Sequence, residues 1–244
     1  MIPAALFVSA LSPIGKAFDD PIVTDRPDFT ESSSVVPAGT LQIESGLTFQ
    51  RVSGGLVISG PELLIRKSVG SKSEVRLGLP DYSLLRANGA RAAGWSDIYL
   101  GAKFQIGPLA NGDGLALIPA ISVPSGNDDF STGSLDPELK VCWSRELNEE
   151  WAVSGMLYGL WTTENGRRTG VLQTTLSFGR RLSEKTAAFF EYAGTFQRSR
   201  PDHLAHIGMT FQPDSNRQWD IHAGVPVSGP DRLPFIAAGY SVRY

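Results

Sequence analysis

The 244-residue chain has a net charge of -3, and its 22 Lys and Arg residues are scattered rather than run together. This balance gives no reason to expect a nucleic-acid partner. Hydrophobic residues make up 41% of the chain, but no run of them reaches the roughly 18 residues that a spanning helix needs. The single cysteine, Cys142, excludes an internal disulfide and a cysteine-based metal site.

The chain opens with a segment that has the composition of a targeting signal. Residues 1–17 are mostly apolar, and the small residues Gly15 and Ala17 would suit cleavage before Phe18. The basic residues that normally open a signal peptide are missing, so we predict an incomplete signal peptide. Residues 18–38 are polar and not strand-like, and we expect either a disordered periplasmic leader or a plug.

From residue 39 to residue 244, apolar and polar residues alternate with the period of a half-exposed strand. In "TLQIESGLTFQ", for example, Leu41, Ile43, Leu47 and Phe49 share one face. About twelve such segments follow one another, and no capped helical pattern lies between them. Their approximate centres are Glu44, Leu64, Leu77, Leu100, Pro119, Lys140, Gly155, Thr175, Glu191, Ile207, Ile221 and Ala238.

The connections between these segments differ in length in a regular way. Those after the even-numbered segments are mostly short, at 69–73, 107–114, 146–150, 181–185 and 212–216. Those after the odd-numbered segments include longer loops, at 83–94, 123–136, 162–170 and 197–202. Short turns at one end and long loops at the other predict an all-β fold, an up-and-down antiparallel transmembrane barrel over residues 39–244.

Two tryptophans support a lipid-facing exterior. Trp151 and Trp161 lie on the same face of one segment, ten residues apart. At about 3.3 Å per residue and a tilt near 40°, they would be about 25 Å apart along the barrel axis, which is the height of the apolar belt. The alternative is a soluble barrel or sandwich, in which both rings would belong to the core.

The last residues have the pattern of a barrel-closing strand. Gly239, Val242 and Tyr244 match the Gly-x-x-apolar-x-aromatic tail of bacterial outer-membrane barrels. This resemblance implies an insertion signal that the barrel-assembly machinery engages. The last strand should pair with residues 41–49, because an unpaired strand edge cannot be tolerated in hydrocarbon.

The stretch "IVTDRPDFTESSSVVPAGTLQIESG" (residues 22–46) resembles the outer-membrane transporter family named for the MetA pathway of phenol degradation. "WSDIYLGAKFQI" (95–106) and "LDPELKVCWSREL" (135–147) are similar to the same family, and the resemblance covers residues 22–244. It implies a β-barrel transporter in the outer membrane of a Gram-negative bacterium. It does not identify the substrate.

The polar face of the alternating segments predicts the lining of the lumen. Asp25, Arg26 and Asp28 of the leader are candidates to pair with these charges as a plug, and a barrel of this size is narrow enough for such a plug to gate it. The charges are of mixed sign, which argues against a strongly ion-selective pore. The lumen-lining candidates are Glu44, Arg76, Asp97, Lys103, Glu138, Lys140, Glu191, His206, Asp220 and His222.

The histidines do not predict an enzyme. His203 and His206 are three residues apart, so on a strand they point to opposite faces. His206 and His222 could approach each other from neighbouring strands, but no carboxylate is fixed beside them. No hydroxyl nucleophile lies among the nearby lipid-facing residues Ala205, Ile207, Ile221 and Ala223. We therefore predict no catalytic, cofactor or metal site.

The sequence as a whole predicts a monomeric outer-membrane channel for small solutes, including aromatic or hydrophobic ones. The expected partners are membrane lipid, lipopolysaccharide, the assembly machinery and the solute. A lipid-modifying hydrolase and a non-conducting structural barrel remain as alternatives. Arginines expected in the long loops could set selectivity or bind lipopolysaccharide phosphates, and they are Arg86, Arg91, Arg167, Arg168, Arg198 and Arg200.

Overall fold

The computed structural model describes residues 20–164, 166–197, 200–229 and 233–244, so the predicted signal peptide at 1–17 lies outside the described residues. Within this part of the chain, no helix is long and apolar enough to cross a membrane. Every strand pairing is antiparallel. The strands are β1 (Leu41–Val52), β2 (Gly55–Gly60), β3 (Leu64–Gly70), β4 (Ser73–Gly78), β5 (Tyr82–Ala87), β6 (Ala90–Trp95), β7 (Ile98–Gln105), β8 (Gly114–Val123), β9 (Asp136–Glu146), β10 (Trp151–Glu164), β11 (Arg167–Arg181), β12 (Thr186–Gln197), β13 (Arg200–Asp214), β14 (Arg217–Ser228) and β15 (Phe235–Arg243).

The described strands form twelve barrel strands, as the sequence predicts. β2 and β3 pair with the two ends of β1 and are therefore two halves of one barrel strand. β4 and β5 make up the next barrel strand, because β4 pairs with β3 and β5 with β2. β6 and β7 make up the one after that. Each later barrel strand is a single β-strand that pairs with its neighbours in chain order.

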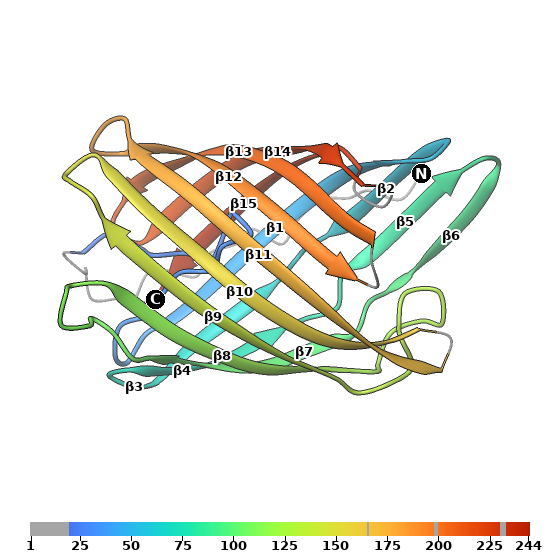
Figure 1. Cartoon of the computed structure of the whole chain (residues 1–244), viewed down its shortest axis with the longest axis horizontal. Coiled ribbons are helices and arrows are strands. Elements are labelled where there is room, and N and C mark those ends of the chain that lie inside the picture. The colour runs from blue at the N-terminus through green and yellow to red at the C-terminus, as the bar shows by residue number, and fades with distance from the viewer. Residues whose placement is uncertain (1–19, 165, 198–199, 230–232) are drawn as a thin grey trace.

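The barrel closes where its last strand meets its first. β15 pairs with β1 over nine positions, from Gln42 opposite Arg243 to Gln50 opposite Phe235. Backbone hydrogen bonds between Leu41 and Tyr244, 3.1 and 2.8 Å long, continue this pairing. The predicted closure is confirmed, and Figure 1 shows the tilted strands of the resulting wall. We call the end with Leu41 and Tyr244 the near end, and the opposite end the far end.

Three neighbouring barrel strands are interrupted at the same height. The breaks lie at residues 61–63, 79–81 and 96–97. Pro61 and Pro80 stand in two of them, and proline has no N–H for the strand ladder. The broken strands still bond to one another, since the Ser96 N–H donates to the carbonyl of Asp81 at 2.9 Å. Proline thus explains two of the three breaks, and the third, at Ser96 and Asp97, lies beside them in the wall.

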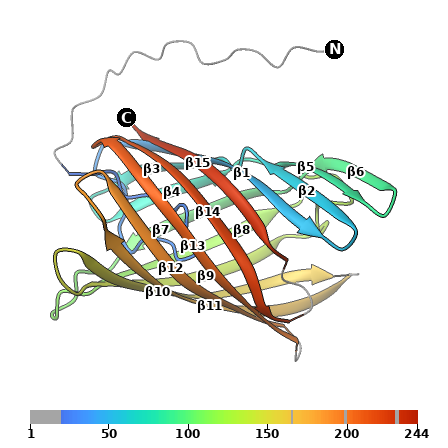
Figure 2. The same cartoon turned by 90° about the horizontal axis from the view of Figure 1, so that it is seen from above.

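One predicted loop is a hairpin instead. Residues 83–94 form most of β5 and β6, which pair from Tyr82 opposite Trp95 to Ala87 opposite Ala90. Asn88 and Gly89, at the tip, have φ values of 50° and 82°, which suit a tight hairpin turn. The hairpin projects at the far end (Figures 1 and 2). The prediction of a loop was wrong because the Asn-Gly turn extends the wall beyond the rest of the barrel.

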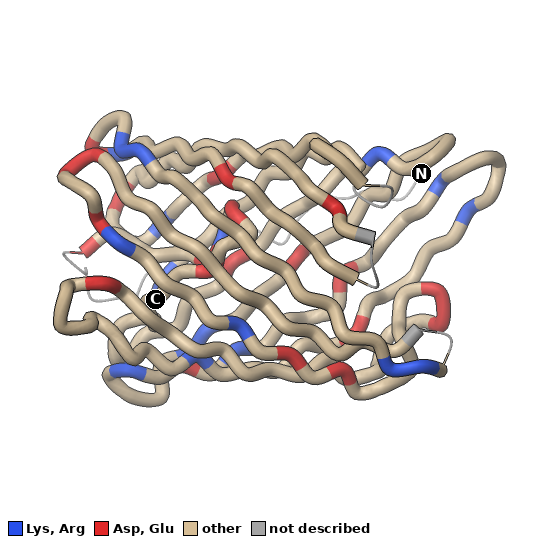
Figure 3. The backbone as a smooth tube through the Cα atoms, in the orientation of Figure 1, with Lys and Arg blue, Asp and Glu red and all other residues tan. Residues whose placement is uncertain are grey.

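The polarity of the barrel is inverted relative to a soluble protein. Large apolar side chains are exposed on the outside of many strands, and among them are Leu47, Phe104, Leu157, Ile207 and Trp219. The buried residues are mainly polar or charged, and Figure 3 shows acidic and basic residues distributed along the wall. Since a soluble barrel would turn its apolar face inward, this arrangement favours a lipid-facing exterior.

The predicted tryptophan pair lies on this exterior. Trp151 and Trp161 are both exposed, at the two ends of β10. Cys142 is buried beside Ile118 and Met156, in a small apolar cluster of the interior.

A charge placed on the outer wall should destabilise the barrel. Leu157 lies between Trp151 and Trp161 on β10 and is 54% exposed. We expect Leu157→Arg to lower the free energy of unfolding by about 2–4 kcal/mol, the cost of Arg near the middle of a bilayer. Urea unfolding in lipid vesicles, followed by tryptophan fluorescence, measures this loss. Asn111→Arg, in an exposed turn, is the control, and equal losses for both variants would argue against a lipid-facing Leu157.

Candidate functional site

The described part of the predicted leader, together with Gly39 and Thr40, runs along the inside of the barrel wall, and these residues (20–40) are called the leader from here on. The leader begins at the near end, where Arg243 donates to the carbonyl of Asp20 at 2.7 Å. It returns to the near end at Thr40, whose carbonyl accepts from the N–H of Ser68 at 3.2 Å. Figure 2 shows the leader within the outline of the barrel. Its middle, from Asp25 to Glu31, contacts inward-facing side chains of several strands.

The carboxylate of Asp25 contacts three cationic side chains of the barrel wall. Its carboxylate accepts from Arg76 at 2.5 Å and from Lys103 at 2.8 Å, and it lies 3.3 Å from Arg66. All four side chains are at least 97% buried. Burial by itself would raise the pKa of Asp25, but the charges of Arg66, Lys103 and Arg76 outweigh it and hold that pKa well below its usual range. Asp25 is therefore a buried carboxylate anchored by three cations.

Glu44 on β1 and Glu74 on β4 bind the backbone of the leader. Glu44 accepts from the N–H groups of Asp25 and Arg26 at 3.0 to 3.1 Å. Glu74 accepts from the N–H of Val36 at 2.7 Å. Arg66 lies between these two carboxylates, 2.9 Å from Glu44 and 2.8 Å from Glu74. The wall thus provides hydrogen-bond acceptors for the leader's backbone N–H groups and cations for its Asp25 side chain.

Glu31 links the same cluster to β9, three barrel strands further along the wall from β4. Its carboxylate lies 2.7 Å from Arg76 on β4 and 2.5 Å from Lys140 on β9. Lys140 also lies 3.4 Å from Glu138. The lumenal charges Arg76, Lys140 and Glu138 are therefore joined through one residue of the leader.

A second chain of contacts runs through the two lumenal histidines. Glu191 on β12 accepts from the N–H groups of Phe29 and Thr30 at 2.9 and 2.8 Å. Nδ1 of His206 lies 2.7 Å from the same carboxylate, and its Nε2 lies 2.8 Å from Nδ1 of His222. The predicted approach of the two rings is observed, but the expectation that no carboxylate is fixed beside them was wrong, because the carboxylate of Glu191 comes from the neighbouring strand β12.

The guanidinium of Arg26 joins this chain at its other end. It lies 3.2 Å from Nε2 of His222 and can only donate, so this nitrogen of His222 is the acceptor. Each histidine is used as a relay of hydrogen bonds between the leader and the wall.

Two glycines make room for Arg26. Gly46 on β1 and Gly239 on β15 face each other across the seam where the barrel closes. A Cβ at either position would overlap with the guanidinium of Arg26. The same guanidinium pairs with Glu62 at 2.5 Å and Asp220 at 3.3 Å. We expect Gly239 to be part of an insertion signal because of its place in the tail. In the structure it also lies against Arg26 of the leader.

Asp28 lies beside Glu191 of the second network, whereas Asp97 lies outside both networks. Burial raises the pKa of Asp28 well above its usual range, and the nearby carboxylate of Glu191 raises it further. Asp97, between β6 and β7, accepts from the N–H groups of Ser125 and Gly126 at 3.0 Å. It therefore fixes the loop after β8 rather than contacting the leader.

The predicted list of lumen-lining residues omitted two members of the site, Arg66 and Glu74. Arg66 is fully buried, yet it stands in the run "LLIRKSV", where apolar residues occupy both faces. Glu74 has the same parity as Arg76 and could have been included on that ground. Among the described residues, no group of three or more His, Cys, Asp and Glu could hold a metal ion.

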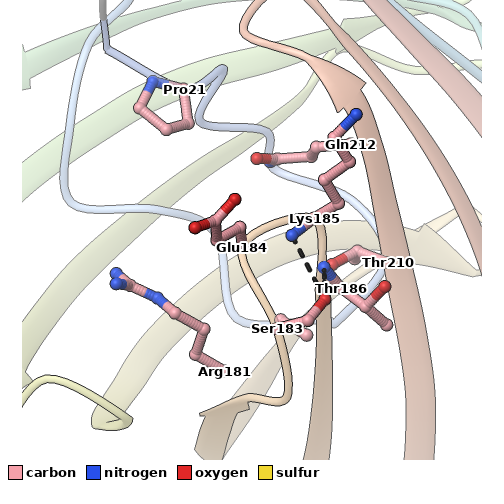
Figure 4. Close-up of a pocket in the computed structure, with 9 residues that line it drawn as sticks. Pro21, Arg181, Ser183, Glu184, Lys185, Thr186, Thr210 and Gln212 are labelled. Atoms are coloured by element: carbon pink, nitrogen blue, oxygen red, sulfur yellow. Dashed lines mark hydrogen bonds between the residues drawn. The ribbon is translucent and has the colours of Figure 1, made fainter.

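Cavities lie on both sides of the leader. Toward the far end, one of about 530 Å³ borders Arg26, Phe29, His222 and Phe235, and another of about 550 Å³ borders β7, β9 and β10. At the near end, a cavity of about 340 Å³ lies between Pro21 and the turn before β12 (Figure 4). Two of these cavities therefore border the leader, one toward each end of the barrel.

Comparisons with known structures agree with this fold. The chain is similar to an outer-membrane channel of Pseudomonas putida F1, with a TM-score of 0.66 and 12% identity over 87% of this chain and 98% of that one. It also resembles the NanC porin (TM-score 0.57, 8% identity, 83% and 98% covered) and the KdgM porin (0.55, 11%, 82% and 98%). No protein with a curated description matches in sequence. The likeness shows that the chain has the β-barrel fold of these proteins.

The family comparison covers nearly the whole described chain. The model described as "Putative MetA-pathway of phenol degradation" matches residues 24–244. This range includes most of the leader and every strand of the barrel. The protein therefore belongs to the family of the MetA pathway of phenol degradation.

Proposed function

We propose that the protein is an outer-membrane channel through which small solutes pass passively, and that the leader is a plug that restricts the lumen. The observation that carries the proposal is the polar interior of a closed barrel, with cavities that reach the leader from both ends. The similar structures named above are described as a channel and as porins, which supports the same function.

The contacts of the leader support a plug rather than a loose segment. Three wall carboxylates, Glu44, Glu74 and Glu191, accept backbone N–H groups of the leader. Asp25 neutralises cations that come from three different strands. At each of these contacts, the leader fills part of the cross-section of the lumen, which would otherwise hold water. Passage would then depend on how readily the leader rearranges or leaves.

Several partners belong to the same proposal. Arg86 and Arg91, opposite each other on the far-end hairpin, are suited to phosphates of lipopolysaccharide. The tail with Gly239, Val242 and Tyr244 would be engaged by the barrel-assembly machinery. A wall that closes on itself leaves no strand edge for a second copy, which favours a monomer. The proposal is of a channel without catalytic activity.

The proposal is tested by planar-bilayer recording of the full chain and of a variant lacking residues 20–36. We expect small or intermittent conductance for the full chain, and conductance several times larger for the deletion. The deletion removes the protein that fills the lumen and exposes its charged lining. Heat-modifiable gel mobility establishes that both barrels are folded. The same conductance in both would contradict the plug, and no conductance from either folded barrel would contradict the channel.

A further inference from the structure

The two lumenal histidines are buried between the leader and the wall. The side chain of His206 is fully buried, and that of His222 is 8% exposed. The ring of His206 packs against three phenylalanine rings, whose centroids lie 4.7 to 5.4 Å away, and they are Phe29 of the leader, Phe189 and Phe235. A movement of either imidazole is therefore felt directly by the leader.

Every ring nitrogen of the pair faces a partner. Nδ1 of His206 lies 2.7 Å from the carboxylate of Glu191, and its Nε2 lies 2.8 Å from Nδ1 of His222. Nε2 of His222 lies 3.2 Å from the guanidinium of Arg26, which can only donate. A carboxylate of the wall therefore stands at one end of the pair, and a cation of the leader stands at the other.

These contacts accommodate two protons on the four ring nitrogens and exclude a third. If Nε2 of His222 carried the third proton, its N–H would face the donors of Arg26. If that nitrogen stayed unprotonated, both nitrogens between the rings would carry hydrogens and would oppose each other across 2.8 Å. One contact is lost in either case. Because the bound leader accommodates fewer protons on the pair than a released one, acid favours its release.

Other titratable groups surround the pair. Asp220 on β14 pairs with Arg26 at 3.3 Å and lies 3.9 Å from Nε2 of His222. Once that nitrogen carries a proton, it can donate to Asp220 and compete with Arg26 for the carboxylate. Among the described residues, the charged and titratable side chains that face the pair or its partners come from the leader, the break after β2, β12 and β14, and they are Arg26, Asp28, Glu62, Glu191 and Asp220.

The other attachment of the leader responds differently to acid. Burial by itself would raise the pKa of Asp25, but three cations hold that pKa well below its usual range. Acid that protonates an imidazole therefore leaves this carboxylate charged and bound. The acid-sensitive contacts are those of the Arg26 side chain and of the segment up to Thr30, whose N–H donates to Glu191 at 2.8 Å.

We propose that His206 and His222 form a pH switch that controls the plug. At neutral pH, the pair joins Arg26 to the wall and keeps residues 26–30 in place. In acid, a third proton on the two rings displaces Arg26 and loosens this segment, while Asp25 keeps the rest of the leader attached. The cavity of about 530 Å³ borders Arg26 and His222, so the displacement would enlarge the open space of the lumen at this point. The inference rests on the proposed plug, because the released segment is part of the leader.

Hydrogen exchange measures the release without any need for conduction. In the purified full chain in detergent micelles, the amides of Asp28, Phe29 and Thr30 are followed at about pH 7.5 and about pH 4.5, a range that spans the ordinary pKa of imidazole. Each rate is divided by that of the same segment unfolded, which removes the intrinsic effect of pH. We expect protection to fall about tenfold in acid, as for the loss of one hydrogen bond to a charged group. Equal protection at both pH values would overturn the proposal.

The amide of Val36 is the control within the same molecule. It donates to Glu74 at 2.7 Å, in the network around Asp25. We expect it to keep its protection at both pH values. An equal loss of protection at Val36 would mean that acid acts on the wall carboxylates in general, and it would overturn the switch.

Substitutions assign the response to the pair. His206→Gln and His222→Gln each remove one titratable ring, and the ratio of protection at the two pH values should approach one in both. His203→Gln is the matched control and should keep the natural ratio, because His203 is the third of the chain's three histidines and lies among the exposed rings of Tyr192 and Phe196. A natural ratio in a folded variant of the pair would overturn the proposal. If neither variant folds, the comparison with Val36 in the natural chain decides.

The switch and the plug can fail separately. Acid should raise the conductance of the full chain to a level below that of the variant lacking residues 20–36. If acid loosens residues 26–30 through the histidines but leaves the conductance unchanged, the plug is contradicted and the switch stands. If the deletion raises the conductance but protection does not depend on the histidines, the switch is contradicted and the plug stands.

Discussion

Asp25→Ala is expected to raise the single-channel conductance to that of the variant lacking residues 20–36, while the barrel stays folded. The reason lies with Lys103, whose ammonium is fully buried. Within the described residues, its hydrogen bonds go to Asp25, Ser32 and Ser34 of the leader, and the only carboxylate among these partners is that of Asp25. Removing one partner of a buried ion pair costs about 3–5 kcal/mol. In Asp25→Ala, the buried ammonium of Lys103 would therefore lack its carboxylate partner. Water would have to enter the lumen and solvate the ammonium in place of the carboxylate.

Digestion with a protease that cleaves after glutamate provides a second measurement of the same change. Glu31 is held in the lumen by Arg76 and Lys140, and its side chain is 13% exposed. If the Asp25→Ala leader leaves the wall, cleavage after Glu31 should become rapid in the folded barrel. Glu149→Ala, in a near-end turn, is the control and should keep the slow cleavage of the natural chain. Natural conductance together with slow cleavage in Asp25→Ala would contradict the role given to this carboxylate.

A double variant separates charge from shape. In Asp25→Ala with Lys103→Met, the buried ammonium is removed together with its counter-ion. Replacing both partners of a buried pair costs much less than removing one. We expect the double variant to recover most of the low conductance of the natural chain, so that the two substitutions are strongly non-additive. Equal conductance in the single and double variants would mean that Lys103 has no part in holding the leader.

The strands could be predicted because each of them carries its own signal. Alternation places Leu47 and Phe49 outside and Glu44 inside without any knowledge of neighbouring strands. The breaks at Pro61 and Pro80 could not be predicted in the same way. They are local defects within an alternation that continues on both sides, and their alignment across three strands depends on register. The number of barrel strands could therefore be predicted from the sequence, whereas the breaks that divide three of them could not.

The site was predictable only in part. Parity placed Arg76 and Lys103 on the polar face, and both are buried in the lumen. It could not show that Asp25 lies between them and Arg66, because the leader has no strand period and its path depends on tertiary contacts. Gly239 shows the same limit. Its place in the tail predicts a role in barrel assembly. That its missing side chain leaves room for Arg26 can be seen only in the structure, where β1 pairs with β15.

The largest effect on stability is expected for Arg66→Met. The guanidinium of Arg66 is fully buried and lies within 3.3 Å of three carboxylates, those of Asp25, Glu44 and Glu74. Without it, buried negative charges would face one another with fewer compensating donors. We expect the free energy of unfolding to fall by about 3–5 kcal/mol, as for other broken buried ion pairs. Urea unfolding in vesicles, followed by tryptophan fluorescence, measures the change.

The control is an arginine in an exposed pair. Arg217 pairs with Asp214 at the near end, with side chains 54% and 37% exposed. Arg217→Met should cost less than about 1 kcal/mol, because solvent screens such pairs. A loss for Arg66→Met no larger than that of Arg217→Met would show that the cluster is hydrated in the folded barrel.

The cost of Arg66→Met should also depend on the leader. In the variant lacking residues 20–36, Asp25 is absent and water can reach Glu44 and Glu74. Charges in contact with water need no partner at close range. We therefore expect Arg66→Met to cost less than about 1 kcal/mol in this background, in the range of exposed ion pairs. The difference between the two backgrounds measures how strongly the leader excludes water from the charged lumen, and an equal cost in both would assign the stabilisation to the wall alone.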